Sequence, residues 1–267
     1  MRLALAFFLR DARIALSYRV SFAVQLLGNL LVLGVCYFVG KTVGRQAIPA
    51  LAPYGGNFFA FLLVGIALAD CVGVSITIFA NQIREGQTTG TLEATLMSPA
   101  PLPIILIYSS IWAYFFSAIR FLLYLAMGVV LCGADLRAAN LASGVVIFLL
   151  TVISFMGLGM LWAGIIMLMK RGESILTTLG YLVVLVSGVL FPANLLPRWL
   201  QRLASLIPLT HALEGMRLAL LRGYGLGELT GILWKLLAFS AILVVAGLTS
   251  FQFALRIAKH TGSLTQY

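Results

Sequence analysis

The sequence predicts an all-α integral membrane protein with six transmembrane helices, an N-terminal amphipathic interfacial helix and a re-entrant helical hairpin. The 267-residue chain is 61% hydrophobic and only 10% charged, and its mean hydropathy is +1.06. Soluble globular domains carry about 25% charged residues, so this composition excludes them. A helix needs about 20 apolar residues to cross a hydrocarbon core of roughly 30 Å, and six such segments fit along the chain.

The apolar runs and the prolines together place the six spans. Proline removes a backbone donor and kinks a helix interior, and all eight prolines of this chain fall between the apolar runs. We therefore treat residues 1–267 as a single transmembrane domain. Its spans are predicted at residues 20–40, 57–80, 104–132, 141–169, 174–191 and 230–253.

Residues 1–19 are predicted to form an amphipathic helix on the membrane surface. Arg2, Arg10 and Arg13 fall on one arc of a helix, and apolar side chains occupy the rest. Such a helix directs its arginines toward anionic lipid head groups. We reject a cleaved signal peptide, because Arg10, Asp11 and Arg13 interrupt the apolar run too early.

The distribution of Lys and Arg predicts the orientation, because these residues are enriched in cytoplasmic loops. With the N-terminus inside, the cytoplasmic segments carry nine Lys and Arg and the outer segments seven, four of which lie in residues 192–229. We predict the plasma (cytoplasmic) membrane, with both termini cytoplasmic. The net charge of +10 is scattered along membrane flanks, which favours anionic lipid as a partner over nucleic acid.

A polar insert, residues 84–101, separates the second and third spans. Gly86 and Gly90 are predicted turn-formers, and Thr91 is a predicted N-cap for a short helix over residues 92–97. Glu93 occupies its first turn, where negative charge is favourable. The apolar face of this helix has no core of its own to enter, so we predict that it docks into a partner. The alternative is a plain loop whose helix lies on the membrane surface.

The stretch "REGQTTGTLEATLMSP" resembles the R-E-x-x-x-G-T-L-E-x-L-L-x-[ST]-P signature at the coupling helix of type-2 ATP-binding-cassette (ABC-2) exporter permeases. It departs from the signature in two places: four residues separate Glu85 from Gly90, and Thr95-Leu96 replaces the usual L-L. The resemblance implies a set of partner-coupling residues, namely Arg84, Glu85, Gly90, Thr91, Leu92, Glu93 and Leu96.

A second stretch, "SGVLFPANLLPRWLQRLASLIPLTHALEGMR", is similar to the series that follows the fifth span in the same family. Residues 197–206 are too few to cross a bilayer, and a second short helix is predicted from Thr210, as its cap, to Leu221. We predict a re-entrant outer hairpin over residues 192–222; two helices lying flat on the outer surface are the alternative. Its characteristic residues are Pro192, Pro197, Arg198, Trp199, Arg202, Pro208, Glu214 and Arg217.

Two charged residues, Asp70 and Arg120, fall inside predicted spans, where ionised groups are costly and usually face protein or water. Counted from the cytoplasmic ends of their spans, they differ in depth by roughly 9 Å at 1.5 Å per residue. They either line a substrate path or form a structural pair.

The chain lacks the G-x-x-x-x-G-K-[ST] phosphate loop, H-E-x-x-H and G-x-S-x-G motifs. Its three cysteines are far apart and suggest neither disulfides nor a metal site. The resemblance implies a permease that exports an amphiphile (lipid, drug-like molecule or lipid-linked glycan) as a homodimer with a separate cytoplasmic ATP-binding subunit, which holds ATP and Mg²⁺. The alternatives are a membrane anchor or an integral membrane enzyme acting on lipid through Asp70, Arg120, His211, Glu214 and Arg217.

Overall fold

The fold is a bundle of long helices. The computed structural model describes residues 2–17, 19–43, 49–98, 100–168 and 173–261, and within these ranges it contains helices and no strand. Four helices there are long and apolar enough to cross a membrane: α3 (Phe58–Thr88), α5 (Leu102–Cys132), α6 (Leu141–Leu168) and α10 (Thr230–Thr261). At 1.5 Å per residue they are about 42 to 48 Å long, which exceeds a hydrocarbon core of roughly 30 Å. The prediction of an all-α membrane protein is confirmed.

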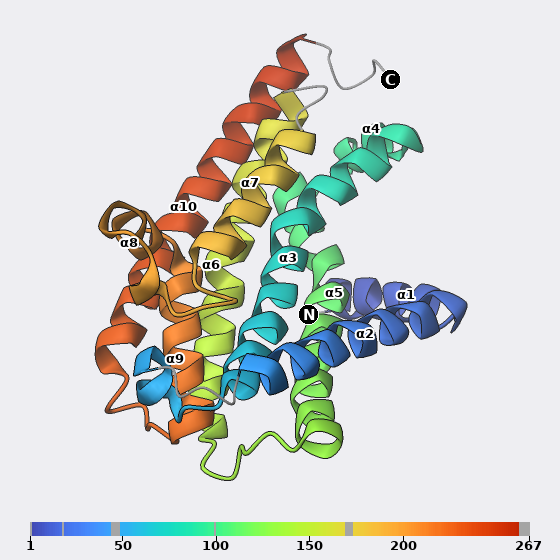
Figure 1. Ribbon diagram of the computed structural model, residues 1–267. Coiled ribbons are helices and arrows are strands. Elements are labelled where there is room, and N and C mark those ends of the chain that lie inside the picture. Colours follow the sequence, from blue (N-terminus) through green and yellow to red (C-terminus); the bar gives the residue numbers. More distant parts are fainter. Residues whose placement is uncertain (1, 18, 44–48, 99, 169–172, 262–267) are drawn as a thin grey trace.

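The α6 helix lies at the centre of the bundle, between α3 and α10 (Figure 1). Gly157 on α6 faces Gly247 on α10, and a Cβ at either position would overlap the backbone of the other helix. Small residues at such a contact allow two membrane helices to approach closely. The main apolar core draws most of its buried side chains from α3 and the shorter helix α9 (Pro208–Arg222), and further ones from α2 (Arg19–Val43), α5, α6 and α10.

Two of the predicted spans differ from these four helices. The α7 helix (Glu173–Val186) has 14 residues and is about 21 Å long, less than the hydrocarbon core. The α2 helix (Arg19–Val43) matches the predicted span 20–40, but it lies across the long helices together with α1 (Arg2–Ser17) (Figure 1). The α1 helix packs on α5 through Phe8 and Trp112, whose ring centroids are 5.2 Å apart.

The α3 helix continues for eight residues beyond the predicted end of the second span, residue 80, through "NQIREGQT". The predicted end of the last span, residue 253, is likewise passed by α10, which reaches Thr261. Both predictions followed hydropathy, which marks where a helix leaves the apolar layer. Gln, Arg and Glu are good helix formers, so the helix persists where hydropathy falls.

The two ends of the bundle carry different short elements (Figure 1). The short helix α4 (Thr91–Leu96) lies at one end, here named the α4 end. The opposite end carries η1 (Pro49–Tyr54), here named the η1 end. The segment between α7 and α10 contains η2 (Ala193–Leu195), α8 (Arg198–Ser205) and α9.

The α9 helix runs from inside the bundle to the η1 end. The ring of His211 near its start stacks on Phe239, the tenth residue of α10, whereas Arg222 at its end binds the carbonyl oxygens of Ala52 and Pro53 in η1. The predicted cap at Thr210 is wrong, because α9 already begins at Pro208. Proline is favourable in the first turn of a helix.

Candidate functional site

The α4 helix is joined to α3 by a tight turn. Thr89 ends α3, and its hydroxyl donates a hydrogen bond to the carbonyl of Glu85 (2.7 Å). Gly90 follows with φ of 68°, a left-handed conformation that favours glycine. The predicted turn at Gly86 is wrong, because Gly86 lies inside α3, and Thr91 begins α4 instead of capping it.

One apolar side chain of α4 enters a core, contrary to the prediction. Leu92 is only 5% exposed, and Leu96 packs at the edge of the same core. The other side chains of this core come from α3, α5, α6 and α10: Phe79, Ile83, Leu102, Leu106, Met160, Ala163, Met167, Phe251 and Ala258. Leu92 therefore packs among side chains of all four long helices.

We give the name α4 surface to exposed residues of α4 and of the segments on either side of it. Met97 is 89% exposed, and Arg84 is also exposed. Glu93 lies within α4, and its side chain is outside what the structure describes. The residues of the α4 surface are Glu85, Thr88, Gly90, Thr91 and Met97.

Asp70 and Arg120 form an ion pair between α3 and α5, with 3.1 Å between Asp70 Oδ2 and Arg120 Nη2. The predicted depth difference of about 9 Å is wrong. Asp70 lies 12 residues after the start of α3 and Arg120 lies 12 residues before the end of α5, so the two antiparallel helices place them at one level. The error arose because the depth of Asp70 was counted from residue 80, eight residues before α3 ends.

Further buried polar groups lie near this pair on α5. Tyr114 Oη, Ser117 Oγ and Arg120 Nε make no hydrogen bond to any described residue. Each unsatisfied buried group costs roughly 1–3 kcal/mol. The α3–α5 contact is therefore polar in a part of the chain that hydropathy marks as apolar.

Sequence reasoning missed a cavity of about 460 Å³ between α3, α6 and α7. Thr77 and Asn81 of α3, Trp162 of α6 and Tyr181 of α7 are among the residues that line it. Asp70, Thr77 and Asn81 are spaced by seven and four residues and share one face of α3. This spacing is the signal in the sequence that indicates a polar stripe on a membrane helix.

Arg217 of α9 is buried, with 3% of its surface exposed. Its guanidinium donates hydrogen bonds to the carbonyl oxygens of Phe61 (3.3 Å), Gly188 (3.0 Å) and Val189 (2.8 Å). The guanidinium carbon also lies 3.4 Å from the centroid of the Phe61 ring. Arg217 therefore links three parts of the chain: α9, which carries it, α3, and the segment that follows α7.

The other predicted hairpin residues divide into exposed and buried groups. Pro192 and Pro208 are buried. The remaining residues are exposed: Pro197, Arg198, Trp199, Arg202 and Glu214. Trp199, Arg198 and Arg202 are all on α8, so this helix exposes both an apolar ring and basic side chains.

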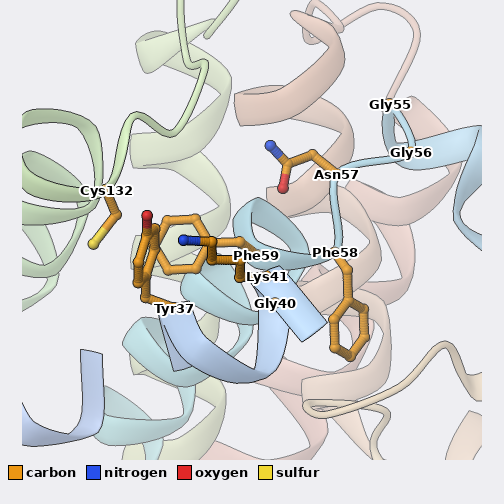
Figure 2. A pocket seen from close by; sticks show the side chains of 9 residues that line it. All are labelled: Tyr37, Gly40, Lys41, Gly55, Gly56, Asn57, Phe58, Phe59 and Cys132. Carbon is orange, nitrogen blue, oxygen red and sulfur yellow. The ribbon is translucent and has the colours of Figure 1, made fainter. Parts of the chain in front are cut away.

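A second cavity, of about 510 Å³, opens at the η1 end (Figure 2). The rings of Tyr37 and Phe59 lie next to each other in it, with centroids 5.8 Å apart. Figure 2 shows the amine of Lys41 beside these rings and Cys132 across the cavity. The cavity lies between the end of α2 and the start of α3.

The five polar residues considered for a lipid enzyme lie at two separate places. Asp70 and Arg120 pair between α3 and α5, whereas His211, Glu214 and Arg217 are on α9. Arg217 is engaged with backbone carbonyls. In the described part of the chain, no three His, Cys, Asp or Glu residues are grouped to hold a metal ion.

The four long apolar helices are those of a multi-pass membrane protein. The family model described as ABC-2 type transporter matches residues 3–221. The chain therefore belongs to the ABC-2 type transporter family, and the resemblance found in its two motifs is confirmed. A comparison with curated proteins gave no match. Members of this family are the membrane permease components of ABC transporters.

Proposed function

We propose that this chain is the permease subunit of an ATP-driven exporter of an amphiphilic substrate, and that it couples to a separate ATP-binding subunit through the α4 surface. The family match over residues 3–221 is the observation that carries this proposal. ATP and Mg²⁺ are bound by the partner subunit. This chain supplies the membrane path.

The packing of α4 supports a role in transmitting force. Leu92 is seated in a core shared by four long helices, so α4 cannot be displaced without moving them. The α3 helix is continuous from Phe58 to Thr88 and extends from the η1 end to the turn before α4. Closure of the ATP-bound partner would shift these rigid helices between inward-facing and outward-facing packings. The nucleotide acts only through its different affinity for the two states.

We place the α4 end in the cytoplasm and the η1 end outside, with six crossings of the plasma membrane and both termini cytoplasmic. In this arrangement α2, which lies across the long helices in the structure, turns along them to provide the first crossing, and α7 with residues 187–197 provides the fifth. The α8–α9 segment is a re-entrant outer hairpin, supported by the position of His211 beside Phe239 within the bundle. The exposed Arg10 and Arg13 of α1 contact anionic lipid.

A pair of permeases forms the transport path, and we propose a homodimer. The exposed apolar side chains of α2 and α7 would then lie against lipid or against the second copy, because both are apolar surroundings. Leu31 and Phe38 of α2 and Leu182 of α7 are examples of such exposed side chains.

Purification from native membranes in mild detergent tests the coupling. We expect a stoichiometric ATP-binding subunit in the eluate together with ATPase activity. Glu93→Lys and Met97→Asp should remove this subunit while the permease still inserts, because Glu93 belongs to the coupling motif and Met97 is 89% exposed. Leu92→Ala is the matched variant that weakens the core instead, so it should lower thermal stability. A preparation without an ATP-binding partner or ATPase activity would contradict the proposal.

A further inference from the structure

We propose that the cavity between α3, α6 and α7, together with Asp70, which lies on α3 between the lining residues Ala69 and Gly73, binds an amphiphile that carries a protonated amine. The apolar body would occupy the cavity, and the amine would bind the carboxylate of Asp70. This inference rests on the proposed function and names the substrate class for it.

The cavity has the size and lining of a small-molecule site. Its volume of about 460 Å³ lies within the range of roughly 300 to 1,000 Å³ typical of such sites. Trp162, Ile166 and Val184 form apolar walls, and Gly73 and Gly180 leave space at the helix surfaces. Tyr181, which also lines the cavity, is 72% exposed.

Asp70 shares the face of α3 that carries two polar residues of this lining, Thr77 and Asn81. Seven residues separate Asp70 from Thr77, which corresponds to about 10 Å along the helix. An amphiphile of moderate length can therefore reach from the apolar walls to the carboxylate. Thr77 and Asn81 add hydrogen-bonding groups along the way.

The arrangement of the Asp70–Arg120 pair favours a cation over an anion. The Asp70 side chain is 26% exposed and that of Arg120 is 14% exposed, so the carboxylate is the more accessible partner. Arg120 contacts Oδ2, which is buried. A carboxylate accepts about four hydrogen bonds, so Oδ1 remains available for an amine. The guanidinium carbon of Arg120 also lies 5.7 Å from the centroid of the Phe116 ring.

The binding test uses the purified chain in nanodiscs of zwitterionic lipid, without the ATP-binding subunit. The probes are dodecylamine and dodecanol that carry a dansyl group at the far end, and energy transfer from Trp162 to dansyl reports occupancy. Empty nanodiscs and a Trp162→Phe variant supply the background. We expect Asp70→Asn to weaken binding of the amine at least tenfold and to leave binding of the alcohol unchanged.

Asp70→Asn also leaves Arg120 unpaired, so a loss of folding must be separated from a loss of binding. Asp70→Asn/Arg120→Gln removes both charges and should bind the alcohol normally and the amine weakly. Asp70→Arg/Arg120→Asp keeps an ion pair but places the cation on α3. This exchange should abolish amine binding and favour the corresponding dansyl carboxylate.

Gly73→Leu tests the cavity itself, because a Cβ at Gly73 meets open space that a leucine side chain would fill. It should weaken binding of both probes, whereas Gly28→Leu on α2, where a Cβ also meets open space, should not. Unchanged amine binding in the folded double variant or in the charge exchange would overturn the inference. That result would leave the proposed function intact, because coupling is measured separately by copurification.

Discussion

Arg217 shows how a charged residue is accommodated in this bundle without an acidic partner. Its planar guanidinium spans three backbone carbonyls, two of which, at Gly188 and Val189, follow the end of α7. Carbonyl groups at a helix end lack partners within the helix and carry partial negative charge. Gly65 makes room for this contact, because a Cβ there would lie 2.5 Å from the Val189 oxygen. Arg217 thus stabilises the interrupted segment after α7.

Arg217→Met should destabilise the protein strongly, because three carbonyl groups lose their donor at roughly 1–3 kcal/mol each. The thermal midpoint in detergent measures the effect, with the exposed Arg198→Ala as the control. Gly65→Ala should lower the midpoint as well, since the new methyl group displaces the guanidinium. Midpoints equal to that of Arg198→Ala would show that these contacts do not stabilise the fold.

The junction of the helices α3 and α4 depends on Gly90 and not on Gly86. Gly86 lies within α3, where a Cβ would make ordinary contact with Leu92 at 3.4 Å. Gly90 has φ of 68° and joins the two helices. The direction of α4, and therefore the position of the α4 surface, is set at Gly90.

The two glycines should respond to alanine in opposite directions. Gly86→Ala should stabilise the protein by about 0.5–1 kcal/mol, because alanine loses less conformational entropy in a helix. Gly90→Ala should cost about 1–2 kcal/mol, because its left-handed conformation brings Cβ against the backbone. Chemical denaturation in mixed micelles compares them, and equal effects would contradict the observed junction.

For the whole molecule, the long helices separate two ends with different surfaces. The α4 end contains a second apolar core and the exposed α4 surface. The η1 end contains an open cavity and the hydrogen bonds of Arg217 and Arg222 to backbone carbonyls. Helices of about 42 to 48 Å extend beyond the apolar layer. We assign this excess mainly to the α4 end, because the polar residues 81–88 belong to it.

This assignment predicts which end is accessible from outside the cell. In a background without Cys36, Cys71 and Cys132, a membrane-impermeant maleimide should label Gly227→Cys in intact cells. Met97→Cys should react only after the membrane is opened. Both positions are exposed, so burial does not explain a difference between them. The reverse labelling pattern would invert the proposed topology.

Local sequence patterns suffice for the helical membrane class, most helix starts and the two motifs that resemble the ABC-2 family, because hydropathy and proline act locally. The ends of α3 and α10 are local as well, since polar helix formers continue a helix beyond the apolar layer, but hydropathy does not mark them. Tertiary packing alone brings Asp70 and Arg120 to one level, buries Leu92 and pairs Arg217 with carbonyls far along the chain. These contacts depend on how separate helices align in space, and no local pattern specifies that alignment.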